Sequence, residues 1–218
     1  YVAHALFGRV NSGRYEVYVL ASCWVATLHN TFSLLERYLI SNARRIIFLL
    51  LVIVLNTGSF YSGLSAPWAA KNIHDQQGQL AVLVQHYLKQ SVAVNDVGLI
   101  SRHNALPVLD LVGLGTKGVY ELRKALGPGS DWISILLVQH ETHYAMIYEH
   151  WFPDWPHHLI KVATYEISGP LFTPAGRRVS LFADSPNSAR ILQQAITRYQ
   201  ADHPARSAWF TVFKPDAP

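Results

Sequence analysis

The sequence has little charge, a single cysteine and no lysine-rich run. Charged residues make up 15% of its 218 residues and hydrophobic residues 50%, whereas an ordinary soluble domain has roughly 25% charged residues. Cys23 has no second cysteine to pair with, which excludes an internal disulfide. The net charge of +4 is modest, so we expect no nucleic-acid partner. This composition is typical of a chain that is partly embedded in a membrane.

The sequence also shows no signal peptide. It begins at Tyr1, and no charged segment followed by an apolar run and a small-residue cleavage site comes after it. We therefore expect that an N-terminal part of the protein, with a bundle of further transmembrane helices, precedes Tyr1. The length is sufficient for one or two domains.

Two uncharged apolar stretches predict transmembrane helices. Residues 46–55 are all apolar, and the uncharged stretch continues to about residue 66, which meets the length of ~20 residues that a spanning helix needs. The alternative for this stretch is a helix buried in a protein core. The second candidate, residues 17–35, contains polar side chains that would face neighbouring helices or a wet cavity.

Arginines indicate the orientation of these two predicted helices. The loop between them contains Arg37, Arg44 and Arg45, so the positive-inside rule predicts that this loop is cytoplasmic. Arg9 and Arg14 count against this orientation. We expect residues 1–68 to form a membrane region in the bacterial plasma membrane and residues 69–218 to lie outside the cytoplasm.

Apolar segments alternate from residue 69 onward in a way that indicates a small α/β layer domain. Strands are predicted at residues 91–94, 107–112, 132–138, 159–165 and 178–182. Helices are predicted at residues 73–89, 117–126, 145–151 and 186–199. The predicted fold class is therefore α/β, with two transmembrane helices followed by an extracytoplasmic α/β domain.

One glycine-rich turn matches a dinucleotide fingerprint. Gly113, Gly115 and Gly118 fit G-x-G-x-x-G between a predicted strand and a predicted helix. The spacing to an acidic residue, Glu141, is longer than the usual ~20 residues. The alternative is a tight strand-to-helix turn, and we expect no cofactor in this chain.

One histidine cluster resembles a metal motif. His140, Glu141 and His143 approach H-E-x-x-H, but Tyr144 stands where the second histidine is needed. We expect no metal ligands here. A divalent metal is an option only for the whole enzyme.

Polar residues at two strand ends are candidate ligand contacts. Asn95 and Asp96 end one predicted strand and Asp110 the next, and ligands gather at the carboxyl ends of strands in open α/β sheets. Two carboxylates there can orient a ligand or act in acid–base chemistry. The alternative is turn formation, which Asn and Asp favour.

A second group of candidate contacts precedes the first predicted transmembrane helix. Arg9 and Arg14 are suited to hold a phosphate, because a planar guanidinium binds it with two hydrogen bonds. Tyr15 and Glu16 follow directly. The alternative for the group is anchoring at the membrane interface.

Several segments resemble a known family. These are Phe7–Arg9, Arg14–Tyr18, Val92–Gly98, Val108–Leu114 and Ile147–Phe152. They are similar to segments of polytopic bacterial glycosyltransferases of the GT-C superfamily, which include dolichyl-phosphate-mannose mannosyltransferase-like and aminoarabinose transferase-like proteins. The resemblance covers most of the chain.

The resemblance implies transfer of a sugar from a polyprenyl-phosphate donor to an extracytoplasmic acceptor. It implies that the catalytic acidic residue lies in a loop upstream of Tyr1, so no catalytic residue is assigned and the chain alone is expected to be inactive. Arg9 and Arg14 become candidate contacts to the donor phosphate, and Asn95 and Asp96 become structural or acceptor-side residues. The alternative is a membrane-anchored domain that binds a glycan or a partner without catalysis.

Overall fold

The structure is a computed structural model. It describes residues 25–27, 29, 41–55, 57–102, 104–127, 129, 131–204 and 208–213. The chain divides into two compact units, Tyr1–Gly63 and Leu64–Pro218. The four candidate contacts in the N-terminal segment lie outside the described residues: Arg9, Arg14, Tyr15 and Glu16.

The apolar segment that predicted a transmembrane helix forms two consecutive helices, α3 (Asn42–Leu55) and α4 (Thr57–Ile73). In the part of the chain that the structure describes, no helix combines the length and the apolar character needed to cross a membrane. The prediction of a fold with two transmembrane helices is therefore wrong, since the predicted span at 46–66 does not form one.

The physical reason lies in the length of α3 and the composition of α4. The 14 residues of α3 give a rise of about 21 Å, short of the ~30 Å hydrocarbon core. α4 is longer, but it contains Pro67 and several small polar residues. Of the other predicted helix, 17–35, only residues 25–27 and 29 are described.

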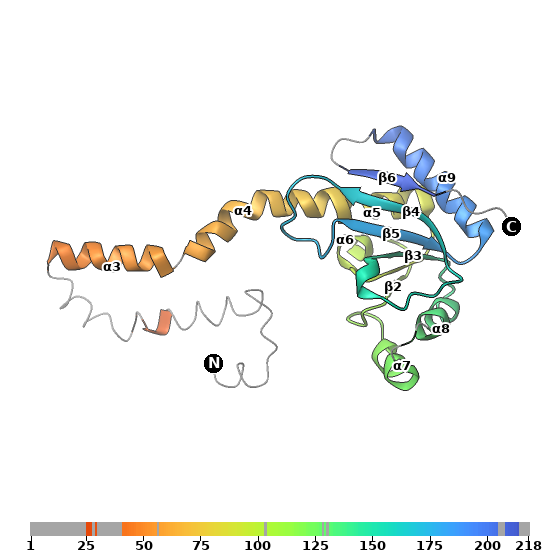
Figure 1. The fold of residues 1–218 in the computed structure, drawn as a ribbon, viewed down its shortest axis with the longest axis horizontal. Coiled ribbons are helices and arrows are strands. Elements are labelled where there is room, and N and C mark those ends of the chain that lie inside the picture. The colour runs from red at the N-terminus through yellow and green to blue at the C-terminus, as the bar shows by residue number, and fades with distance from the viewer. Residues whose placement is uncertain are drawn as a thin grey trace. The chain divides into compact units, whose positions relative to one another are not determined.

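The second unit contains a mixed six-stranded sheet with the order β2-β1-β3-β5-β4-β6 (Figure 1). The strands are β1 (Val92–Val94), β2 (Val108–Asp110), β3 (Tyr144–Ile147), β4 (Ile160–Ile167), β5 (Arg178–Ala183) and β6 (Ala208–Val212). β1 pairs in parallel with β2 and β3. The remaining pairs, β3–β5, β5–β4 and β4–β6, are antiparallel.

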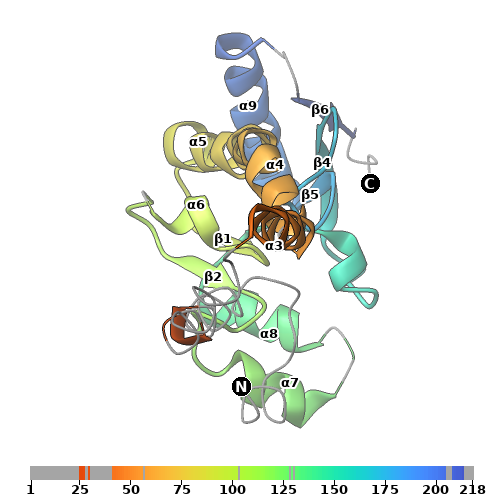
Figure 2. The same cartoon turned by 90° about the vertical axis from the view of Figure 1, so that its left-hand side faces the viewer.

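Helices cover both faces of this sheet. On one side, α4 continues through η1 (His74–Gly78), α5 (Gln79–Val82) and η2 (Leu83–Leu88), and this segment packs beside α9 (Pro186–Asp202). α6 (Gly98–Arg102), α7 (Val119–Leu126), α8 (Asp131–Gln139) and η3 (Glu149–Trp151) follow β1, β2 and β3. Figure 2 shows α5 and α9 on one side of the sheet and α8 on the other.

The alternation of side chains along β1 explains the two layers, because successive strand residues point to opposite faces. Val92 and Val94 belong to a core with Leu83, Val84 and α9. Ala93 belongs to a second core, which α8 supplies with Trp132, Ile133, Leu136 and Leu137. All of β1 is buried, as expected for a strand that is covered on both faces.

Residues 132–138 form helix α8, so the strand predicted there is wrong. Trp132, Ile133, Leu136 and Leu137 are buried, while Val138 is exposed. This spacing is that of one helix face, and a short apolar run cannot be assigned to helix or strand by periodicity alone. The helix predicted at 145–151 is also wrong, since β3 and the short turn η3 occupy it.

Four predicted strands and three predicted helices coincide with elements of the structure. The strands are β1, β2, β4 and β5. The helices are the η1–α5–η2 segment, α7 and α9. Ser185 caps α9, because its hydroxyl accepts a hydrogen bond from the backbone N–H of Ser188. The edge strand β6 was not predicted.

Candidate functional site

The order of the parallel strands locates a candidate site. The connection from β1 to β2 carries Ile100 of α6 in the first core, whereas the connection from β2 to β3 carries Val119 and Trp132 in the second. Successive connections thus leave on opposite faces, which makes the region between β1 and β3 a topological switch point. Ligands of open α/β sheets bind outside the strand carboxyl ends at such a point.

We call the residues at these strand ends the carboxyl edge, consisting of Asn95, Asp96, Asp110, Tyr148 and Glu149. Asn95 and Asp96 follow β1, Asp110 ends β2, and the last two follow β3. Val94 and Asp110 are paired across the two strands. The structure therefore brings together the three candidate residues that sequence analysis found in the α/β domain.

Asn95 joins the ends of β1 and β3. Its side-chain oxygen accepts a hydrogen bond of 3.1 Å from the backbone N–H of Tyr148. The residue is buried, and its side-chain nitrogen has no partner among the residues that the structure describes. Asn95 also lines a small cavity of about 20 Å³. The bond to Tyr148 fixes the relative position of two strand ends, which is a structural role at the centre of the candidate site.

Two glutamines from η1 complete the polar network. The hydroxyl of Tyr148 donates to Oε1 of Gln76 at 2.6 Å, and Nε2 of Gln76 donates to the carbonyl of Gly176 at 2.9 Å. Gln77 donates to the carboxylate of Asp96. Burial raises the pKa of Tyr148, and the charge of Asp96 raises it further. The phenol therefore stays protonated and acts as a fixed hydrogen-bond donor.

Sequence analysis did not find Gln76 or Gln77. Their signal is weak, because two adjacent glutamines in a helical segment are normal on a solvated face. Gln76 is instead completely buried. Its burial depends on the distant segment around Gly176, which no local pattern reveals.

The carboxylate of Asp110 organises the glycine-rich loop. Oδ1 accepts from the backbone N–H of Val112 at 2.8 Å and Oδ2 from that of Gly115 at 2.7 Å. The backbone N–H of Asp110 donates to the hydroxyl of Thr116 at 2.9 Å. The loop therefore wraps around one buried carboxylate. Because the amide of Gly115 is already bound, this geometry favours the tight-turn interpretation over a pyrophosphate site.

Glu149 is held by groups from the antiparallel strands. Its carboxylate accepts hydrogen bonds from Lys161 of β4 and Ser180 of β5. Partial burial acts to raise the pKa of Glu149, but these hydrogen bonds and the charge of Lys161 outweigh it, and the pKa lies below the ordinary value. Glu149 is thus an ionised, paired carboxylate at neutral pH. Sequence analysis did not single it out as a site residue.

The histidine cluster lies at the connection from α8 to β3. Nδ1 of His143 is 2.6 Å from the carboxylate of Asp184, and Glu141 has the positive φ of 48° that ends the helix. Partial burial acts to raise the pKa of Asp184, but hydrogen bonds from His143 and from Ser188 outweigh it and lower the pKa. Within the described ranges, no group of three or more metal-binding side chains occurs.

An open pocket of about 730 Å³ adjoins the carboxyl edge, and we call it the α7–α8 pocket. Tyr120, Arg123 and Lys124 line it from α7, Trp132 from α8, and Trp151 from η3. Val112, which follows β2, also lines it. The pocket therefore lies beside the segments that follow β2 and β3.

A family model described as "Domain of unknown function (DUF8728)" matches residues 71–182. The chain belongs to this family. The match begins just before η1 and ends within β5. The DUF8728 segment thus contains the whole carboxyl edge, both glutamines and the α7–α8 pocket. No curated protein and no solved structure matches the chain.

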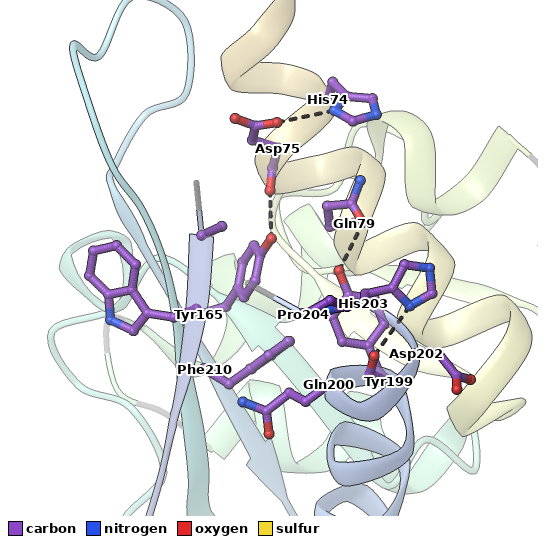
Figure 3. Close-up of a pocket in the computed structure, with 12 residues that line it drawn as sticks. His74, Asp75, Gln79, Tyr165, Tyr199, Gln200, Asp202, His203, Pro204 and Phe210 are labelled. Carbon is purple, nitrogen blue, oxygen red and sulfur yellow. Dashed lines mark hydrogen bonds and ion pairs between the residues drawn. The ribbon is translucent and has the colours of Figure 1, made fainter. Parts of the chain in front are cut away.

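A second pocket, of about 340 Å³, lies mostly outside the DUF8728 segment, and we call it the aromatic pocket. Tyr165 of β4, Tyr199 of α9 and Phe210 of β6 line it, with ring centroids 4.5 to 5.6 Å apart. Figure 3 shows the Tyr165 hydroxyl bonded to the carbonyl of Asp75 and the Tyr199 hydroxyl bonded to Gln79. Aromatic walls with a few polar groups are typical of small-molecule sites.

Proposed function

We propose that the chain is part of a GT-C-type glycosyltransferase that transfers a sugar from a polyprenyl-phosphate donor to an extracytoplasmic acceptor. In this proposal the DUF8728 domain binds and orients a substrate, and a carboxylate outside the domain serves as general base. The sequence resemblance supports the proposal, because two of its segments, Val92–Gly98 and Val108–Leu114, form β1, β2 and the loops of the carboxyl edge. The reaction is proposed to occur on the extracytoplasmic side of the bacterial plasma membrane.

One observation in particular supports the proposal that the domain orients substrate while the general base lies outside it. The three carboxylates of the carboxyl edge already accept hydrogen bonds from the protein: Asp96 from Gln77, Asp110 from two backbone amides, and Glu149 from Lys161 and Ser180. A general base needs a carboxylate within hydrogen-bond reach of the substrate proton. Asp110 has both carboxylate oxygens bound by the fold, and Glu149 is paired with the ammonium group of Lys161 through one oxygen. Carboxylates held in this way are suited to orienting neighbouring groups rather than to taking a proton.

The surface of α3 supports a lipid-linked substrate. Ile47, Leu50 and Val54 are 66%, 56% and 63% exposed, and other apolar residues of the helix are exposed as well. A helix that is apolar on all sides is stable only in contact with apolar material. The membrane lipids that surround a polyprenyl-phosphate donor would supply such contacts to α3.

The second candidate is a domain that binds a glycan or a partner without catalysis. The aromatic pocket favours it, because Tyr165, Tyr199 and Phe210 supply apolar ring surfaces beside polar side chains such as Gln200 and Asp202. This arrangement is suited to recognising an uncharged ring with hydroxyl groups.

A transfer assay distinguishes the two candidates. Membranes from cells that express the whole protein are incubated with a panel of polyprenyl-phosphate-linked radioactive hexoses and pentoses, and the release of polyprenyl phosphate is measured. The proposal predicts release with at least one donor. It also predicts that Arg14→Ala lowers kcat/KM for that donor. The decrease should correspond to about 1.5–3 kcal/mol of activation free energy, the range for a hydrogen bond to a charged group. Release from no donor, with the protein folded and abundant, would leave the non-catalytic domain as the better account.

A further inference from the structure

We propose that the α7–α8 pocket binds a phosphate group together with the saccharide attached to it. This inference rests on the proposed function in one respect, namely that the natural ligand carries both groups. The evidence for the site itself comes from two cations, the aromatic rings around them and the position of the pocket in the fold.

Two cations line the pocket and are free to bind an anion. Within the described part of the chain, no ion pair joins Arg123 or Lys124 to a carboxylate, whereas Lys161 and Arg178 are each paired with one. One acidic side chain, Asp154, also lines the pocket. The pocket therefore carries an excess of positive charge. A planar guanidinium with a neighbouring ammonium is suited to a phosphate.

Arg123 is held in place by an aromatic surface. Its guanidinium lies 5.1 Å from the centre of the Trp132 ring, a cation–π arrangement. Trp132 is itself buried in the second core. A guanidinium held over a ring can still donate from its N–H groups, and less side-chain entropy is lost when an anion binds.

A ladder of rings fixes the position of Trp132. The centroid distances are 6.3 Å from Trp132 to Phe152, 5.8 Å from Phe152 to Trp155, and 5.0 Å from Trp155 to Phe182 of β5. Aromatic pairs at such distances interact favourably beyond their buried area. These contacts connect the Trp132 ring, over which Arg123 lies, to the sheet, as expected for a pre-organised binding site.

Two exposed rings provide a surface for the saccharide. Tyr120 is 70% exposed and Trp151 is 43% exposed, and both line the same pocket as the two cations. Binding pockets commonly combine aromatic surfaces with a few polar groups that fix orientation. Trp151 is the last residue of η3, which follows β3, and Val112 follows β2, so the saccharide would lie outside the strand carboxyl ends.

Helix stabilisation alone does not explain these features. Arg123 and Lys124 lie in the last turn of α7, where cations interact favourably with the helix dipole. That role requires neither the position of Arg123 over the Trp132 ring nor the exposed rings that line the same pocket. Phosphate binding is a property that a purely helix-stabilising role would not produce, and it is therefore the property to measure.

The test is a binding titration with two kinds of probe. The purified chain is titrated with glucose 1-phosphate and, separately, with phosphatidylcholine vesicles that carry polyprenyl-phosphate-linked glucose, with pure phosphatidylcholine vesicles as the blank. Binding is followed by tryptophan fluorescence and calorimetry. The proposal predicts saturable binding of at least one probe. Glucose 1-phosphate binding alone indicates a soluble sugar phosphate as ligand, and preferential vesicle binding indicates a lipid-linked one.

Variants of the two cations locate the site. The double variant Arg123→Gln/Lys124→Gln is expected to weaken binding at least about tenfold, because each lost hydrogen bond to a charged group is worth that much. The single variant Arg123→Lys keeps the charge and should weaken binding less. The matched control is Arg190→Gln, which removes an exposed arginine of α9 outside the pocket. This control should bind as the unchanged chain does.

Trp151→Ala tests the saccharide surface. It is expected to weaken the binding of glucose 1-phosphate and to leave the binding of inorganic phosphate unchanged. Circular dichroism confirms folding, which an exposed side chain such as Trp151 should not disturb.

Two results would overturn the inference. One is the absence of binding to either probe by the folded chain, and the other is unchanged binding by the double variant. Neither result decides the proposed function, because sugar transfer is measured separately in the membrane assay. Conversely, phosphate-dependent binding that is lost in the double variant supports the site even where no transfer is detected.

Discussion

The loop around Asp110 provides a sharp test of how the carboxyl edge is built. Asp110→Ala removes both oxygens that accept from the amides of Val112 and Gly115. Because Asp110 is only 2% exposed, water cannot easily replace these bonds. Each hydrogen bond to a charged group contributes about 1.5–3 kcal/mol. We expect a loss of about 3–5 kcal/mol in the free energy of unfolding, since some relaxation of the loop will offset part of the sum.

A urea titration of the purified chain, followed by circular dichroism, measures this loss. Asp110→Asn retains one acceptor oxygen but turns an NH₂ group toward an amide donor, so its loss should be intermediate. The control is Asp154→Ala, an exposed carboxylate whose removal should change stability by less than about 0.5 kcal/mol. Hydrogen exchange at Val112 and Gly115 should accelerate in Asp110→Ala. A variant as stable as the unchanged chain, with unchanged exchange at both amides, would refute the role assigned to Asp110.

Two further predictions concern the same edge. Gly113→Ala should destabilise the chain by about 1–3 kcal/mol in urea unfolding, because Gly113 has φ of 89° and an added Cβ would lie 3.1 Å from Cβ of Val119; an unchanged midpoint would contradict this. In Glu149→Gln, the free energy of unfolding should decrease less steeply as the pH is lowered than it does in the unchanged chain. The pKa of Glu149 is depressed in the folded chain, so its contribution is present above the ordinary value of 4.5 and is lost as pH falls through the lower folded value. An identical acid limb in the variant would show that Glu149 contributes nothing.

Part of the candidate site could be predicted because polar residues stand at the ends of two predicted strands. Asn95, Asp96 and Asp110 follow apolar runs, and the rule that parallel strands present their carboxyl ends together was enough to expect them at one edge. The role that the structure gives to Asp110 was the turn alternative rather than a free ligand contact. Sequence alone could not decide between these, because both require the same residue type at the same place.

The remaining features of the fold and of the candidate site could not be predicted from the sequence, because most of them depend on tertiary contacts. The burial of Gln76 depends on the segment around Gly176. The assignment of α8 as a strand failed because a continuous apolar run fits both states. The α7–α8 pocket depends on a ladder of rings from three separate segments. The transmembrane prediction failed where a strongly apolar run was extended across residues 56–66, which are only weakly apolar.

The central claim is that the DUF8728 domain orients substrate and does not supply the general base. The most direct measurement is kcat for sugar transfer by the whole protein in membranes, compared between the unchanged chain and Glu149→Gln. Glu149 is the most exposed carboxylate of the carboxyl edge and therefore the one best placed to take a proton. We predict a change in kcat of less than about tenfold. A decrease of about 100- to 10,000-fold at unchanged stability, the range for loss of a general base, would contradict the claim and would place the chemistry within the domain.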